Sequence, residues 1–125
     1  MIVNQISSYK ELVVWQKSIA LVKKVYALLR SFPEEERFGL TSQIRRSAIS
    51  VPLNIAEGFG RGSSKSFLQF LYVSRGFLYE LETQLYIAKD LNFISDNQEI
   101  ENLISEIGKM LNSMIQKLKL KNSNH

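Results

Sequence analysis

The chain has 125 residues, of which 45% are hydrophobic and 22% charged, a composition typical of one folded domain with one core. It carries 16 Lys or Arg against 12 Asp or Glu, so its formal net charge is +4 and its isoelectric point is near 9.4. The lack of cysteine excludes disulfides, thiolate zinc sites and cysteine nucleophiles, and it fits the reducing cytoplasm in which we expect this protein to work.

No targeting or membrane segment is predicted. The first residues lack the basic stretch and apolar run of a signal peptide, and no apolar run approaches the roughly 18 residues that span a bilayer. A modest basic excess permits nucleic-acid binding without requiring it.

The first helix is predicted over residues 9–31. Its apolar residues recur at intervals of three and four, in the series Leu12, Trp15, Ile19, Val22, Val25 or Tyr26, and Leu29. We interpret Trp15 as an anchor of the core. The helix should end near Ser31, because Pro33 disfavours helical geometry at Phe32.

The second helix is predicted over residues 41–60, with Thr41 as its N-cap. Pro52 lies inside it and removes one backbone donor, at a cost of about 3 kcal/mol. We expect one kinked helix in which a side chain or water meets the freed carbonyl of Ala48, and the hydroxyls of Ser47 and Ser50 are nearby candidates. The alternative is two helices broken at Val51.

The second helix has an unusually wide apolar arc. Its polar residues occupy one narrow stripe, Gln43, Arg46, Ser50, Asn54, Glu57 and Arg61, and Arg45 is the exception on the apolar side. A helix that is apolar over more than half its circumference is buried on two sides. One side can cover the core of its own subunit, and the other predicts a contact with a second copy in a homo-oligomer.

Three interpretations of the polar stripe remain open. It is a solvated face, a hydrogen-bonded subunit contact, or a nucleic-acid surface on which Arg46, Arg61 and Lys65 contact phosphates. Glu57 weakens the third interpretation, because its carboxylate repels phosphate. Arg75 and neighbouring tyrosines on the next helix are a further mixture of basic and aromatic residues.

Glycines follow the second helix and interrupt the third. Gly58, Gly60 and Gly62 predict a helix end and a turn with positive φ. A third helix is predicted over residues 64–91, with Ser63 or Ser64 as its N-cap. Gly76 lies inside that helix, where it suggests a close approach to the second helix.

A fourth helix is predicted over residues 96–121. Ser95 and Gln98 have the spacing of a capping box, and residues 122–125 are expected to fray. Four helices with short connections predict an all-α fold, an antiparallel up-down-up-down four-helix bundle over residues 1–125.

The sequence gives little support for a catalytic site or a metal site. The only histidine is His125, the last residue, so neither a di-iron site nor a Ser-His-Asp triad is predicted. Glu57 and Glu80 are the remaining carboxylate pair. We favour structural ion pairs of the three acids Glu57, Glu80 and Glu82 with the three arginines Arg45, Arg46 and Arg75. The sequence therefore predicts no catalytic residue, no metal and no cofactor.

Several segments resemble the family of proteins encoded in intervening sequences of bacterial 23S rRNA genes, also called the S23 ribosomal protein family. The most specific is the block Gln43-Ile-Arg-Arg46 through Asn54-Ile-Ala-Glu-Gly58, and Leu12-Val-Val-Trp15-Gln16 and Glu80-Leu-Glu-Thr-Gln-Leu85 match as well. Leu53 departs from the family, which often has a small polar residue there.

The resemblance implies a helical bundle that forms a ring-like homopentamer, without an established enzymatic activity and with a suspected link to RNA or ribosomes. We therefore expect a non-catalytic oligomer whose basic surface binds RNA or a ribosome-associated partner. The alternative is a protein–protein adaptor with no nucleic-acid role.

Overall fold

The computed structural model describes residues 6–123 and contains four long α-helices. They are α1 (Val13–Leu29), α2 (Leu40–Gly60), α3 (Ser64–Asp90) and α4 (Gln98–Ser123). Short 3-10 helices, Tyr9–Glu11 and Glu34–Glu36, precede α1 and α2, and no strand occurs within this range. The predicted all-α class with four helices is confirmed.

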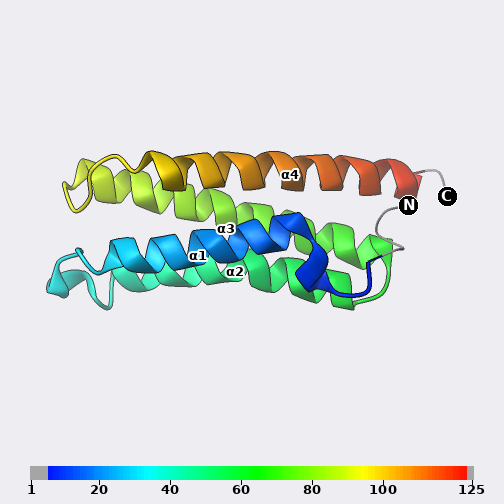
Figure 1. Cartoon of the computed structure of the whole chain (residues 1–125), viewed down its shortest axis with the longest axis horizontal. Coiled ribbons are helices and arrows are strands. Elements are labelled where there is room, and N and C mark those ends of the chain that lie inside the picture. Colours follow the sequence, from blue (N-terminus) through cyan, green and yellow to red (C-terminus); the bar gives the residue numbers. More distant parts are fainter. Residues whose placement is uncertain (1–5, 124–125) are drawn as a thin grey trace.

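The four helices lie side by side along the long axis of the molecule (Figure 1). Each helix contacts two others, in the closed order α1, α2, α3, α4, and the contact between α2 and α3 is the most extensive. The connections from α1 to α2 and from α3 to α4 lie at one end, and the connection from α2 to α3 lies at the other (Figure 1).

The core runs between the four helices. Its fully buried large side chains are Leu21, Val25, Ile44, Val51, Ile55, Leu71, Leu78, Leu81, Ile107 and Leu111. They recur at helical spacing on each helix, so burial of these stripes is the main force that holds the helices together. At about 1.5–3 kcal/mol for each large apolar side chain, this core outweighs any single polar contact.

On α1 the buried face differs from the predicted one. The residues that face the core are Val14, Ser18, Leu21, Val25 and Leu29. Trp15 is only half-buried and packs edge-to-face on Tyr9, with 5.3 Å between ring centroids. It therefore lies at the edge of the core and not at its centre. The apolar residues of α1 cover two faces, and simple spacing did not distinguish them.

The start of α1 also differs from the start of the predicted first helix. Leu12 has extended backbone, with φ −71° and ψ 124°, and separates the 3-10 turn from α1.

At the other terminus of the chain α4 continues through Ser123, so the predicted fraying at residues 122 and 123 is wrong. Residues 124–125, including His125, lie outside the described range.

Thr41 is not the N-cap of α2. The helix already begins at Leu40, and Thr41 is buried with no hydrogen-bond partner for its hydroxyl. The carboxylate of Glu36 instead accepts a hydrogen bond from the Leu40 amide at 3.2 Å. A side chain from the preceding turn therefore caps α2, which local capping rules do not anticipate.

Ser95 is likewise not the cap of α4. The side chain of Asn97 accepts a hydrogen bond from the Ile100 amide at 3.0 Å, so the helix starts two residues later than the Ser95–Gln98 pattern predicts. Asn and Ser are equally good caps, and spacing alone does not choose between them. The N-cap of α3 is Ser63, whose hydroxyl accepts from the Ser66 amide, as predicted.

Helix α2 passes through Pro52 as one continuous helix, so the alternative of two helices broken at Val51 is wrong, and the kink at Pro52 stays a prediction. The Ser50 hydroxyl donates to the carbonyl of Arg46, not to the freed carbonyl of Ala48, because a serine bonds back one turn of its own helix. A second hydroxyl, that of buried Ser74 in α3, donates to the Val51 carbonyl at 2.9 Å and ties α3 to the residue before the proline.

The glycine at which two helices meet is Gly58, not Gly76. A Cβ on Gly58 would lie 2.6 Å from Cβ of Phe70 and 3.1 Å from Cδ1 of Phe67, so α3 packs directly on this backbone. A Cβ on Gly76 would meet nothing within 4 Å. Only Gly62 has the predicted positive φ, at +81°, whereas Gly58 and Gly60 are helical.

Candidate interaction surface

The polar stripe of α2 lies on the surface of the subunit. Gln43, Arg46, Glu57 and Arg61 are exposed, and Ser50 and Asn54 are half-buried. Helical spacing places all six on the same side of α2, because every step of three or four residues returns close to the same direction.

Hydrogen bonds within the stripe are local. The Asn54 side-chain amide donates to the Ser50 carbonyl at 2.7 Å, and the Arg61 guanidinium pairs with Glu57 at 2.8 Å one turn away. Arg61 also lies over the ring of Phe70 from α3, 5.1 Å from the ring centroid. One end of the stripe is thus held in place, and the charge of Arg61 is already compensated.

The remaining arginines point to other neighbours. Arg45 lies over the ring of Tyr26 from α1, at 5.3 Å. The Arg75 guanidinium donates to the side-chain carbonyl of Asn112 from α4 at 3.0 Å and lies over Tyr72. The predicted pairing of the glutamates with Arg45, Arg46 or Arg75 is therefore wrong: Glu57 pairs with Arg61, and within residues 6–123 neither Glu80 nor Glu82 forms an ion pair.

The nine candidate residues do not form one site. Arg45 is on the α1 side of α2, Arg75 contacts α4, and Gln43, Arg46, Lys65 and Glu80 are exposed. No sequence pattern links Arg75 with Asn112, because 37 residues separate them. Within residues 6–123 no group of three or more His, Cys, Asp or Glu could hold a metal ion.

A shallow apolar groove lies between α1 and α2. It has a volume of about 220 Å³, and the residues that line it include Trp15, Ile19, Ile49, Pro52 and Leu53. Leu53 is 60% exposed at its rim. This groove is what remains of the wide apolar arc of α2 after α1 has covered part of it.

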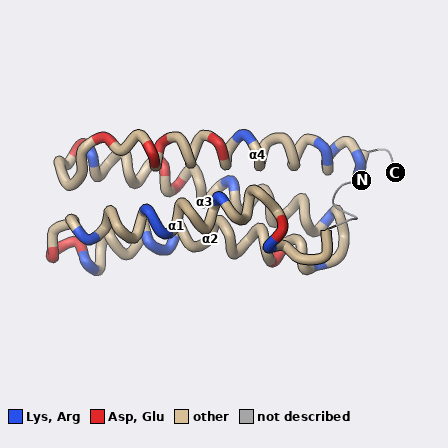
Figure 2. The backbone as a smooth tube through the Cα atoms, viewed as in Figure 1, with Lys and Arg blue, Asp and Glu red and all other residues tan. Residues whose placement is uncertain are grey.

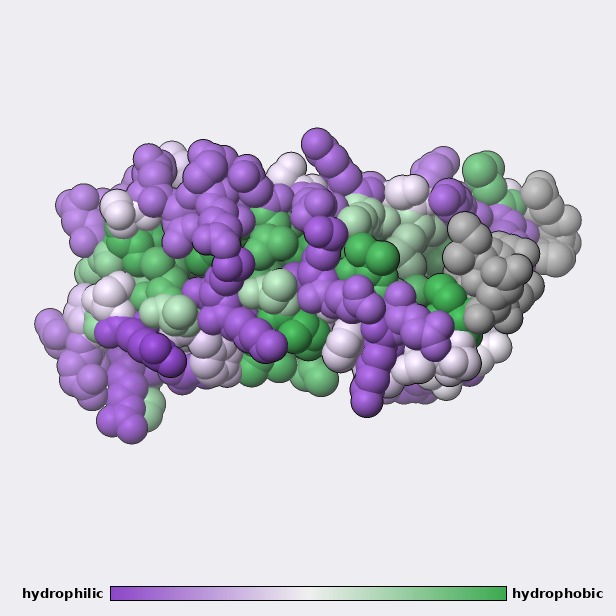
Figure 3. All heavy atoms as spheres, in the orientation of Figure 1, coloured by the Kyte–Doolittle hydropathy of each residue, from purple (hydrophilic) through white to green (hydrophobic). Residues whose placement is uncertain are grey.

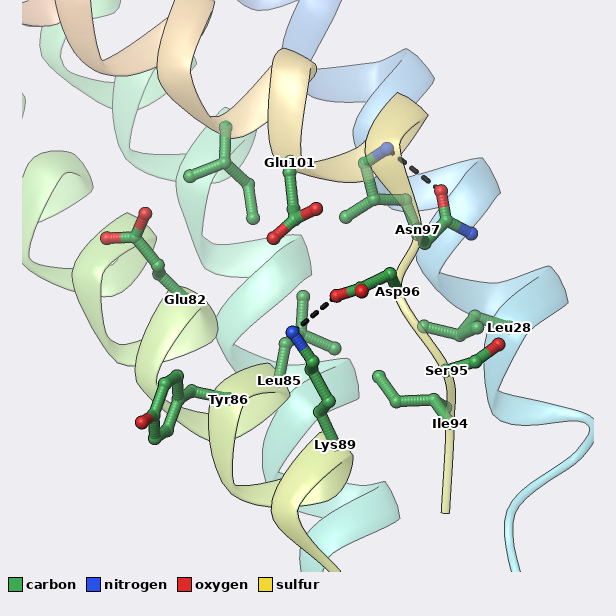
Figure 4. Close-up of a pocket in the computed structure, with 12 residues that line it drawn as sticks. Leu28, Glu82, Leu85, Tyr86, Lys89, Ile94, Ser95, Asp96, Asn97 and Glu101 are labelled. Carbon is green, nitrogen blue, oxygen red and sulfur yellow. Dashed lines mark hydrogen bonds and ion pairs between the residues drawn. The ribbon is translucent and has the colours of Figure 1, made fainter. Parts of the chain in front are cut away.

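A second hollow lies at the end of the molecule where α3 leads into α4. Its lining includes the apolar residues Leu28, Leu85 and Ile94 together with charged residues such as Lys89 and Asp96 (Figure 4). Lys89 pairs with Asp96, and this hydrogen bond raises the pKa of Lys89. Lys89 and Asp96 thus compensate each other, whereas Glu82 and Glu101, which also line this hollow, form no ion pair within residues 6–123.

Apolar side chains also follow the seam between α1 and α4, with charged side chains on both sides (Figure 3). Lys17 and Glu106 bridge the seam at 3.1 Å, and Leu12, Val13 and Met110 line a hollow near the start of α1. A partly exposed ion pair of this kind contributes about 0–1 kcal/mol, so the apolar contact beneath it dominates.

These features define an all-α protein of four long helices with an apolar groove and exposed basic residues on its surface. The family model of the 23S rRNA-intervening sequence protein matches residues 10–113. The chain belongs to this family. The resemblance in the α2 block and around Glu80 is confirmed by this match.

A solved structure supports the assignment. It is a protein of unknown function from the S23 ribosomal protein family of Bacteroides thetaiotaomicron VPI-5482, which is 28% identical and superposes with a TM-score of 0.76. The match covers 82% of this chain and 98% of that chain. A search of curated proteins finds no match. Within residues 6–123, none of the helices has the length and apolar character that a membrane-spanning helix needs.

Proposed function

We propose that this chain is the non-catalytic subunit of a homo-oligomer that binds RNA or an RNA-containing partner such as a ribosomal particle. The subunit is an antiparallel up-down-up-down bundle, and the family resemblance favours a cytoplasmic homopentamer. The observation that carries the binding role is the net charge of +4 on a small subunit. Assembly multiplies this charge, and a strongly positive particle attracts polyanions.

The groove between α1 and α2 supports the assembly. An apolar residue as exposed as Leu53, beside half-buried Ile49, Ala56 and Trp15, loses water contact when a second copy covers it. The half-buried and exposed polar residues Asn54, Gln43 and Arg46 lie on the same helix and supply hydrogen-bonding groups at the edge of such a contact.

The first test is the mass of the protein in solution. Leu53→Glu places a charge on the groove and should lower the mass toward that of a 14.4 kDa monomer in light scattering after gel filtration. Leu120→Glu is the matched control, because Leu120 is 57% exposed on α4, away from the groove. A parent protein that is monomeric at micromolar concentration contradicts the assembly.

The second test is binding of a fluorescent RNA stem-loop at increasing salt. Binding through phosphates weakens steeply as salt rises, since counterions are released from the RNA. Weak binding that does not depend on salt contradicts the RNA role.

The apolar groove also favours the second candidate function, a protein–protein adaptor. A stable protein partner that remains bound to the parent after nuclease treatment, and does not bind the Leu53→Glu variant, supports the adaptor function over RNA binding.

A further inference from the structure

The positive charge of this protein is concentrated toward one end. Residues 57–70 and 113–123 hold five Lys or Arg against one Glu, whereas the rest of the chain holds eleven against eleven Asp or Glu. We call this end the basic end; its lysines are Lys65, Lys117, Lys119 and Lys121, and its one arginine, Arg61, is paired with Glu57. Figure 2 shows the basic residues on the last turns of α4 and acidic residues along its first half.

The fold brings these residues together from separate parts of the chain. Gly62, with φ +81°, reverses the chain between α2 and α3. The Ser64 hydroxyl then donates to the side chain of Asn122 at 3.1 Å, across 58 residues of sequence. Lys65 and Lys121, the neighbours of these two residues, therefore lie at the same end of the molecule.

The lysines of the basic end are available to a ligand. All four are exposed, and within residues 6–123 none of them forms an ion pair; Arg61, paired with Glu57, is the exception. Elsewhere the basic residues are compensated more often, since Lys17, Lys24, Arg37 and Lys89 each pair with an acid. The field at the basic end is thus largely uncancelled.

Helix stability does not account for the whole cluster. Lys119 and Lys121 are favourable at the C-terminus of α4, where they face the negative end of the helix dipole. Lys65, however, lies in the first turn of α3, where a positive side chain opposes the dipole.

We propose that the basic end is the surface that binds the phosphate backbone of RNA, through Lys65, Lys117, Lys119 and Lys121. This inference rests on the proposed function and identifies its surface. It favours the basic end over the α2 stripe, where Glu57 neutralises Arg61. Lysine is a point charge without the rigid fork of arginine, so the contact positions RNA by its backbone and reads little of its sequence.

The test compares two triple variants that remove the same charge. The first is Lys117→Gln, Lys119→Gln and Lys121→Gln, and the control is Lys23→Gln, Lys24→Gln and Lys89→Gln, away from the basic end. Affinity for a fluorescent RNA stem-loop is measured between about 50 and 200 mM KCl, and the salt slope should fall by about 0.7–0.9 for each phosphate that the variant no longer neutralises. Circular dichroism and solution mass verify that both variants keep the parent fold and assembly.

We expect the first variant to bind at least about tenfold more weakly at low salt and the control to bind less than about threefold more weakly, because only the first variant removes charges that touch the phosphates. Equal effects overturn the basic end as the surface but leave RNA binding intact. A parent protein that does not bind the stem-loop overturns the proposed RNA role itself. Binding of vesicles with anionic lipids, without binding of RNA, overturns the RNA assignment in favour of a membrane surface.

Discussion

At the scale of single residues, the close contact between α2 and α3 depends on the absence of a Cβ atom at Gly58. Gly58 leaves room for Phe67 and Phe70, and Phe67 also meets Phe59 edge-to-face at 6.0 Å. Gly58 belongs to the block that resembles the family, and its conformation is helical. Its value is therefore space for a neighbouring helix rather than freedom in a turn.

Gly58→Ala should destabilise the protein by about 1–3 kcal/mol, because the added methyl group must displace Phe70. Gly76→Ala is the matched control: its Cβ meets nothing, so the gain in helix propensity should stabilise by about 0.5–1 kcal/mol. Urea unfolding followed by circular dichroism measures both. Equal effects of the two changes would contradict the close contact at Gly58.

At the scale of helices, the starts of α2 and α4 are set by side chains outside the predicted capping positions. Glu36 reaches the first turn of α2 from the preceding connection, and Asn97 caps α4. Figure 4 shows the Asn97 contact beside the pair of Lys89 and Asp96. The connection between α3 and α4 is thus held at two adjacent residues, one by a cap and one by an ion pair.

Asn97→Ala should lower the free energy of unfolding by about 0.5–2 kcal/mol, because the Ile100 amide loses its acceptor. Ser95→Ala, two residues earlier on an exposed position, should change it by less than about 0.5 kcal/mol. Thermal and urea unfolding of the two variants compare the caps directly. A larger decrease for Ser95→Ala would restore Ser95 as the cap.

At the scale of the whole molecule, the uneven distribution of charge matters more for the proposed RNA binding than the net charge does. In a ring with cyclic symmetry whose subunits stand with their long axes along the symmetry axis, every subunit points the same way, so the basic ends of all copies gather on one rim. Dihedral symmetry would place them on opposite sides instead. Under the proposed cyclic assembly, one rim presents Lys65, Lys117, Lys119 and Lys121 from every subunit to the same RNA.

Assembly and RNA binding should therefore be coupled. If Leu53→Glu dissociates the oligomer, its affinity for the RNA stem-loop should fall by at least about tenfold, because one subunit reaches fewer phosphates than a rim does. The basic end itself is unchanged in this variant, which separates the effect from that of the lysine substitutions. Dissociated subunits that bind as tightly as the parent would contradict a shared rim.

Much of this architecture is readable from the sequence. Apolar spacing predicted four helices, and most of their bounds were within two residues of the observed ones. The family block of α2 was recognisable in the same way. The site was less predictable: Arg75 meets Asn112, and Ser64 meets Asn122, across 37 and 58 residues, and no local pattern encodes such pairs.

The sequence by itself determined the all-α class, the family and the surplus of positive charge, because these depend on composition and on spacing along single helices. Tertiary structure alone decided which glycine separates two helices, which face of α1 enters the core and where the charge gathers. Those features depend on which segments lie side by side. The wide apolar arc of α2 illustrates the difference between sequence and tertiary structure. Its width can be read from the sequence, but it is the packing of α2 against α1 that leaves Leu53 exposed at the rim of a groove.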